Sequence, residues 1–112
     1  MVSASANTHA ILERAGLSPF VDVVIDGNLI GSGGLRPKPA PDSVLAACHR
    51  LGVAPELVAA FETTPAGIVA ARVAGICHIF AVNREGRTQE LTAWGADRVV
   101  SDLEDLIEVS LR

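Results

Sequence analysis

The sequence has no cluster of basic residues and no long apolar run. Its nine lysines and arginines are outnumbered by thirteen acidic residues, which gives a net charge of −4. Nucleic-acid-binding surfaces usually carry a basic patch, so we expect no nucleic-acid partner. A membrane-spanning helix takes about 18 or more apolar residues, and no run here approaches that length. The opening residues, MVSASANTHA, also lack the basic and apolar parts of a signal peptide. We therefore expect neither a membrane span nor a signal peptide.

Cysteine is scarce as well. Cys48 and Cys77 lie far apart in the sequence and form no CxxC pair. Two free thiols are typical of a reducing compartment, so we expect a cytoplasmic protein. The sequence leaves a disulfide between the two cysteines open but does not require one.

Several familiar motifs are missing. The glycine-rich stretch GSGG at 31–34 is followed by prolines instead of GK[ST] or a helix, which excludes a P-loop and a dinucleotide fingerprint. No GxSxG occurs, which argues against an esterase-type serine nucleophile. Cys77 and His78 are adjacent on a predicted strand and would point to opposite faces, so they make a poor shared metal site.

What is present is the composition of one folded domain over residues 1–112. Hydrophobic residues make up 49% and charged residues 20% of the chain, far from the signature of disorder. Helix-like and strand-like segments alternate along the chain. The predicted strands cover 21–26, 57–61, 76–82 and 97–101. The predicted helices cover 7–15, 41–51, 65–74, 88–95 and 102–110, and a glycine-rich loop covers 27–35. Apolar strands spaced by helices predict an α/β fold with three α/β/α layers around a mainly parallel sheet.

Three polar stretches lie where ligands gather in such sheets, at or after the carboxyl ends of strands. They are VSASANT at 2–8, RPKPAPD at 36–42 and AFETTPAG at 60–67. In the first stretch, hydroxyls and free backbone N–H groups at a helix start suit an anion. The alternative is simple capping of the helix by Ser5 or Asn7.

The other two stretches each offer one charged side chain. Lys38 sits between prolines that stiffen the backbone, and its ammonium suits a phosphate. The alternative is a solvated lysine in a loop. Glu62 stands at the end of an apolar strand, where a carboxylate could bind Mg²⁺ through oxygen. The alternative is a surface glutamate that favours the start of the next helix.

Together, the order and spacing of these stretches resemble the haloacid-dehalogenase-like phosphohydrolases, specifically their β-phosphoglucomutase-like branch. The resemblance covers essentially the whole chain. KPAPDSVLAACHRLGV and AGIVAARVAG carry it most specifically. VSASANT is similar to the second motif of the family, KPAPD to the third and FETTPAG to the fourth.

The resemblance implies Mg²⁺-dependent phosphoryl transfer through an aspartyl-phosphate, on sugar phosphates or similar small molecules. Carried over to this sequence, it makes Ser3, Ala4 and Asn7 phosphate-binding residues. It makes Lys38 the catalytic residue that neutralises charge on the transferring group, and Glu62 a metal ligand.

Two departures from the family pattern follow from the residues. The nucleophile of the family lies in a DxD motif, and this sequence contains no DxD. The chain therefore resembles the C-terminal part of a core domain, motifs two to four, without the nucleophile strand and without the cap domain that helps to choose the substrate. In addition, Thr63 stands where the family pattern has an aspartate that ligates Mg²⁺. We expect the chain to be inactive alone, with doubtful metal binding.

The resemblance also places the absent strand beside LVAAF, which would leave an apolar sheet edge unpaired. Such an edge invites pairing with another chain. We expect a homodimer or an N-terminal partner at this edge, or a poorly folded chain. The alternative function is a non-catalytic remnant that acts as an oligomerising or phosphate-binding module.

Overall fold

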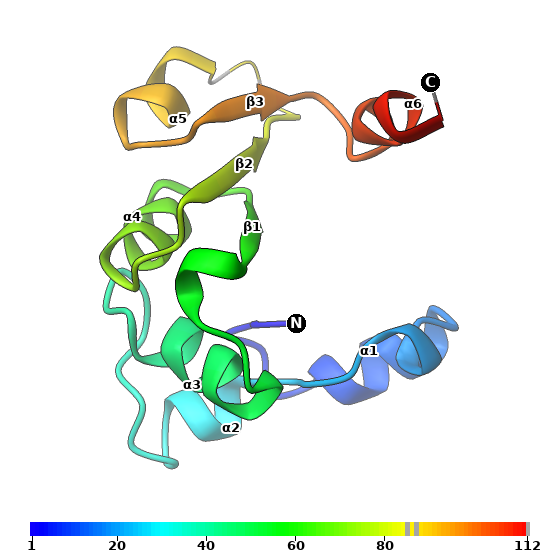
Figure 1. The fold of residues 1–112 in the computed structure, drawn as a ribbon. Helices are drawn as coiled ribbons and strands as arrows, with labels where there is room; N and C mark the ends of the chain where they lie inside the picture. Colours follow the sequence, from blue (N-terminus) through cyan, green and yellow to red (C-terminus); the bar gives the residue numbers. More distant parts are fainter. Residues whose placement is uncertain (85, 87, 112) are drawn as a thin grey trace.

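The structure of the protein is a computed structural model, which describes residues 1–84, 86 and 88–111. Figure 1 shows its helices and strands along the chain. The α-helices are α1 (Thr8–Arg14), α2 (Gly27–Ile30), α3 (Asp42–Leu51), α4 (Pro65–Val73), α5 (Thr88–Ala93) and α6 (Glu104–Leu111). The strands are β1 (Ala59–Glu62), β2 (His78–Val82) and β3 (Arg98–Val100), and two 3₁₀ helices cover Ser18–Phe20 and Pro55–Leu57. No helix of the described part is long and apolar enough to cross a membrane.

The three strands form one parallel sheet in the order β1-β2-β3. Ala60 is paired with Ile79 across the first two strands. Ile79 and Ala81 are fully buried and belong to the main core, together with Ile68 and Ala70 of α4. The predicted α/β class with a parallel sheet is therefore confirmed.

The sequence sets the ends of α4 locally. Thr64 precedes the helix with extended backbone, and its Oγ1 accepts a hydrogen bond of 3.1 Å from Gly67 N. Pro65 follows at the first helical position, where its missing N–H costs nothing. Gly75 lies just past the helix with φ +95°, a conformation that favours glycine. The helix thus begins at the carboxyl end of β1, next to Glu62.

The other face of the sheet is only partly covered in the described part of the chain. The rings of Phe61 and Phe80 stack there, with centroids 5.2 Å apart and planes 13° from parallel. Phe61 remains 50% exposed. It lines an open apolar pocket together with Leu103, Leu106 and Ile107, which lie in α6 or just before it.

The strand predicted over 21–26 is wrong, and so is the first part of the loop predicted over 27–35. Only Ile25 pairs, in an isolated parallel bridge with Val2. A β-branched run forms a strand only where a neighbouring strand is long enough to pair with it, and residues 1–3 offer a very short partner. Directly afterwards, Asp26 caps α2, so the chain turns into a helix where a loop was expected.

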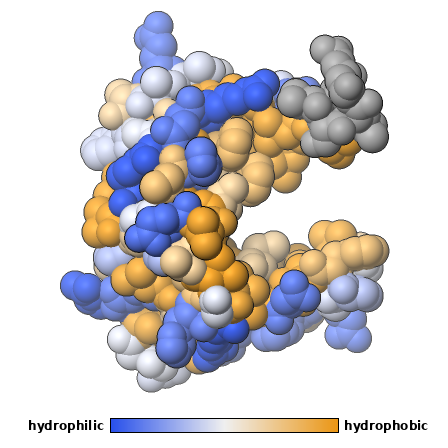
Figure 2. Space-filling model, in the orientation of Figure 1, coloured by the Kyte–Doolittle hydropathy of each residue, from blue (hydrophilic) through white to orange (hydrophobic). Residues whose placement is uncertain are grey.

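The expected apolar sheet edge is present. β1 pairs only with β2, so its other edge has no strand beside it among the described residues. A cavity of about 310 Å³ lies along this edge, lined by Met1 and Val2 as well as by β1 and α3. Figure 2 shows the molecule hollowed on this side, between the arm that carries α6 and the arm that carries α1, with hydrophobic residues on the inner wall.

Candidate functional site

The centre of the candidate site is an ion pair between Lys38 and Glu62. Lys38 Nζ lies 2.9 Å from Glu62 Oε1 and 3.0 Å from Oε2, so the ammonium donates to both carboxylate oxygens. The side chains are 22% and 14% exposed, respectively. Lys38 comes from the proline-rich loop and Glu62 is the last residue of β1. The structure thus brings together two residues that lie far apart in the sequence and that we selected separately from it.

Gly67 allows the Glu62 carboxylate to lie against the first turn of α4. A Cβ atom at position 67 would collide with Glu62 Oε2 and lie only 2.7 Å from its Cδ. The start of a helix also carries partial positive charge from its unpaired N–H groups, which favours a carboxylate there. Sequence reasoning missed Gly67, because the need for a glycine arises from this close approach and not from the backbone of the helix.

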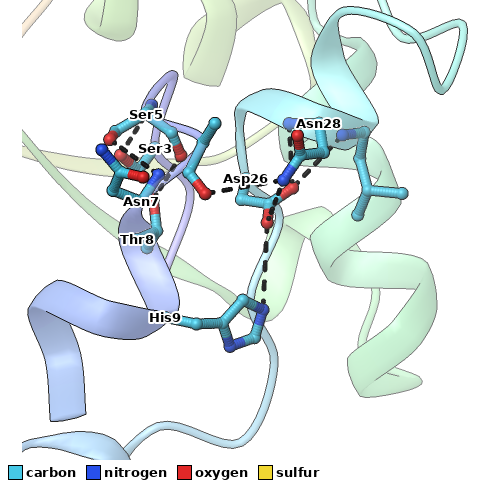
Figure 3. Close-up of polar contacts among 9 residues, drawn as sticks. Ser3, Ser5, Asn7, Thr8, His9, Asp26 and Asn28 are labelled. Carbon is cyan, nitrogen blue, oxygen red and sulfur yellow. Dashed lines mark hydrogen bonds and ion pairs between the residues drawn. The ribbon is translucent and has the colours of Figure 1, made fainter.

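The loop over residues 3–7 is folded by its own hydroxyl groups (Figure 3). Ser5 N donates to Ser3 Oγ at 3.2 Å, and Asn7 N donates to Ser5 Oγ at 3.1 Å. Both serine oxygens therefore act as acceptors, and within the described residues their hydroxyl protons have no acceptor. The Ala4 N–H likewise donates to no described group. These donors, together with the Ala6 N–H and the Asn7 side-chain amide, are groups in this loop that a bound anion could use.

Asn7 stands at the N-cap position of α1, but its side chain makes no capping hydrogen bond. The simple capping role that we considered for Asn7 is therefore wrong. Ser5 instead binds the backbone N–H of Asn7, and Thr8 Oγ1 donates to Ser5 O at 2.7 Å. The Asn7 side chain is left exposed beside the loop.

Among Ser3, Ala4, Asn7, Lys38 and Glu62, only Glu62 lines the cavity beside β1. Val2, directly before Ser3, and Glu62 both line it. In the described structure, no hydrogen bond or ion pair joins Ser3, Ala4 or Asn7 to Lys38 or Glu62. An anion in this region would therefore have to bridge the two parts.

The residues present do not form a Mg²⁺ site by themselves. Both oxygens of Glu62 are held by Lys38, and Thr63 is exposed and offers only a neutral hydroxyl. Across residues 1–84, 86 and 88–111, no group of three or more histidine, cysteine, aspartate or glutamate side chains could hold a metal ion. Because Mg²⁺ requires several hard oxygen ligands, this donor set does not fit the ion.

Asp26 is a buried carboxylate that sequence reasoning did not single out. Its Oδ1 accepts from Asn28 N at 3.1 Å and from Leu29 N at 3.2 Å, and His9 Nε2 lies 3.9 Å from its Oδ2. The hydrogen bond from Leu29 N is the main cause that holds the pKa of Asp26 below its usual value. An aspartate just before a short polar turn is a known capping signal, and it was the available clue.

The fold is α/β, and an ion pair of a lysine and a carboxylate lies at the carboxyl end of the first strand of its parallel sheet. A family model described as haloacid dehalogenase-like hydrolase matches residues 2–75. The chain belongs to the haloacid dehalogenase-like hydrolase family.

Known proteins of similar sequence or structure show which members of that family the chain resembles. The beta-phosphoglucomutase of Mycobacterium bovis is 40% identical over 110 residues, which cover 96% of this chain and 42% of that protein. The phosphorylated carbohydrates phosphatase of Thermotoga maritima is 38% identical over 71 residues, covering 63% of this chain and 31% of that protein. A crystal structure of a conserved haloacid dehalogenase-like protein from Agrobacterium tumefaciens superposes with a TM-score of 0.81 at 28% identity, covering 98% of this chain and 52% of that chain. The chain thus spans about half or less of the length of these relatives.

Proposed function

We propose that this chain supplies the phosphate-binding part of a phosphoryl-transfer site that acts on phosphorylated sugars or similar small molecules. The observation that carries the proposal is the Lys38 ammonium, which the carboxylate of Glu62 holds at the carboxyl end of β1. The names of the relatives, a beta-phosphoglucomutase and a phosphatase of phosphorylated carbohydrates, support the substrate class. Two free cysteines among the described residues are compatible with action in the cytoplasm.

Each residue of the site then has a distinct role. Ser3 donates its hydroxyl proton and Ala4 its backbone N–H to phosphoryl oxygens, and Asn7 contacts the phosphate or the rest of the substrate. Lys38 neutralises negative charge that grows on the transferring group, which is the main means by which proteins assist phosphoryl transfer. Glu62 holds Lys38 in place by accepting from it with both oxygens.

The covalent step of the family needs an aspartate that this chain does not supply in a DxD motif. Because Glu62 and Thr63 do not form a Mg²⁺ site alone, we assign no step of this chain to the metal. We propose instead that the nucleophile and the missing metal ligands come from another polypeptide segment. The free edge of β1 is the place for such a segment, because its unpaired N–H and C=O groups can accept a further strand.

A second candidate function is a non-catalytic module that binds phosphate or forms oligomers. Thr63 in place of a metal-binding aspartate and the open apolar edge of β1 favour this candidate. In that case a second copy of the chain occupies the edge, and phosphate binds without turnover.

The test is turnover of an aryl phosphate by the purified chain, with and without Mg²⁺, beside Lys38→Ala. Both proposals predict no turnover above that of the variant. Mg²⁺-dependent turnover that is lost in Lys38→Ala would contradict both, because it would require a nucleophile within this chain or across its dimer. Sedimentation of the same sample separates the candidates, since a stable homodimer favours the oligomerising module.

A further inference from the structure

The turn formed by residues 26–28 packs directly on the loop that carries the proposed phosphate donors. Gly27 N donates to Ser5 O at 3.0 Å. Two residues earlier, Ile25 O accepts from Ser3 N at 2.9 Å. Asn28 Nδ2 reaches Ala6 O at 3.5 Å. The two segments are thus joined by two backbone hydrogen bonds and one from the Asn28 side chain.

Gly27 lies so close to this loop that no other residue fits without displacing it. A Cβ atom at position 27 would collide with Ala4 O and lie 2.8 Å from Ala6 N. Both neighbours are backbone atoms, which cannot rotate away as a flexible side chain could. Since non-bonded heavy atoms pack at about 3.5–4.0 Å, a methyl group here would push the loop away by roughly 1 Å.

Asp26 fixes the turn that presses on the loop. The residue is only 7% exposed, and its carboxylate accepts from two successive backbone N–H groups, those of Asn28 and Leu29. These bonds cap α2 and hold Gly27 in the orientation in which its own N–H meets Ser5 O. Loss of the cap would loosen the contact between turn and loop without adding any atom to it.

We propose that Gly27 and Asp26 are positioning residues for the phosphate-binding loop. They touch no reacting group themselves. Gly27 sets how closely the loop lies to the turn, and Asp26 keeps the turn rigid, so that the Ser3 hydroxyl and the Ala4 N–H point to one bound anion. The inference rests on the proposed function, because it needs the loop to bind phosphate.

The test measures the dissociation constant of inorganic phosphate, by NMR titration of the whole chain, for four variants and the wild type. Gly27→Ala moves the loop and Asp26→Ala removes the cap. Asp26→Asn keeps a side-chain oxygen that caps as well as aspartate. Gly16→Ala is the control for stability, since Gly16 has φ +70° but an added Cβ meets nothing within 4 Å. Thermal unfolding of each protein is recorded alongside, so that binding is compared well below every midpoint.

A displacement of about 1 Å at a positioned group can cost up to about 100-fold, and we expect Gly27→Ala to weaken phosphate binding at least tenfold. We expect the Asp26→Ala variant to weaken binding as well and Asp26→Asn to restore it to within about twofold. Gly16→Ala should lower the unfolding temperature but leave the dissociation constant unchanged.

Unchanged binding in Gly27→Ala, with only the unfolding temperature lowered, would overturn the inference and leave the proposed function intact. If Gly27→Ala fails to fold, the two Asp26 variants provide the test. Equal phosphate binding by Asp26→Ala and the wild type then overturns the inference. No phosphate binding by the wild type is a different result, because it refutes the proposed function and the inference with it.

Discussion

The ion pair between Lys38 and Glu62 gives a quantitative test of the site geometry. We consider Lys38→Met and Glu62→Gln, alone and combined, because these changes remove one charge each and keep most of the side-chain volume. The double-mutant cycle then isolates the interaction between the two side chains from their other contacts.

The size of the coupling follows from the burial of the pair. Fully exposed ion pairs contribute about 0–1 kcal/mol, and hydrogen bonds to charged groups about 1.5–3 kcal/mol. Lys38 donates to both carboxylate oxygens, and the two side chains are 22% and 14% exposed. Water still reaches the pair, so we expect a coupling free energy of about 1–2 kcal/mol, between these limits. Each single variant should lower the unfolding temperature by roughly 5 °C.

The assay is urea unfolding at fixed pH, with the midpoint and the slope fitted separately for each protein. An unchanged slope shows that the variants differ in stability and not in the extent of unfolding. The exposed pair Arg36–Asp42, with side chains 72% and 20% exposed, serves as a control and should show weaker coupling that salt reduces further. A coupling free energy below about 0.3 kcal/mol for the Lys38–Glu62 pair would refute the ion pair as described here, because additive variants share no direct interaction.

Three further predictions concern the fold around the site. Thr64→Ala should destabilise the chain by about 1 kcal/mol in urea unfolding, because it removes the side-chain cap of α4. Thr64→Ser should retain most of the stability, and equal losses of stability in both variants would contradict the cap. Asp97 accepts from Ile79 N, and this bond holds its pKa below the usual value. The contribution of Asp97 to stability is therefore complete above about pH 3.9 and is lost as the pH falls through the lowered pKa. Asp97→Asn should make the free energy of unfolding depend less on pH in the acid range. An unchanged pH dependence would argue against the hydrogen bond from Ile79 N. A thiol reagent should modify the exposed Cys77 quickly and Cys48 only on unfolding, since Cys48 is buried and burial raises its pKa; rapid modification of both would contradict the packing of α3.

The fold was predictable where local signals agreed with the tertiary structure. Thr64, Pro65 and Gly75 mark both ends of α4 in the sequence, and the helix runs between them. The β-branched run over 21–26 failed as a strand because strand formation depends on a partner elsewhere in the chain. Only Ile25 pairs with another segment, through an isolated bridge to Val2.

The charged residues of the site were predictable from the ends of expected strands and from the resemblance to a family. Lys38 and Glu62 were selected in this way, and their direct contact was found only in the structure. Gly27 and Gly67 could not be selected, because their importance comes from close approach to segments that are not evident locally. A single sequence reveals charged and polar side chains of a site more readily than it reveals the glycines whose missing side chains leave space for neighbouring groups.

The most direct test of the proposed phosphate site is an NMR titration of the ¹⁵N-labelled chain with inorganic phosphate. We predict saturable shifts of the Ala4 and Ser5 amide signals. We also predict that Lys38→Ala abolishes these shifts, although Lys38 lies far away in the sequence. If these amides do not respond, or respond equally in Lys38→Ala, then the loop at residues 3–7 and Lys38 do not form one phosphate site.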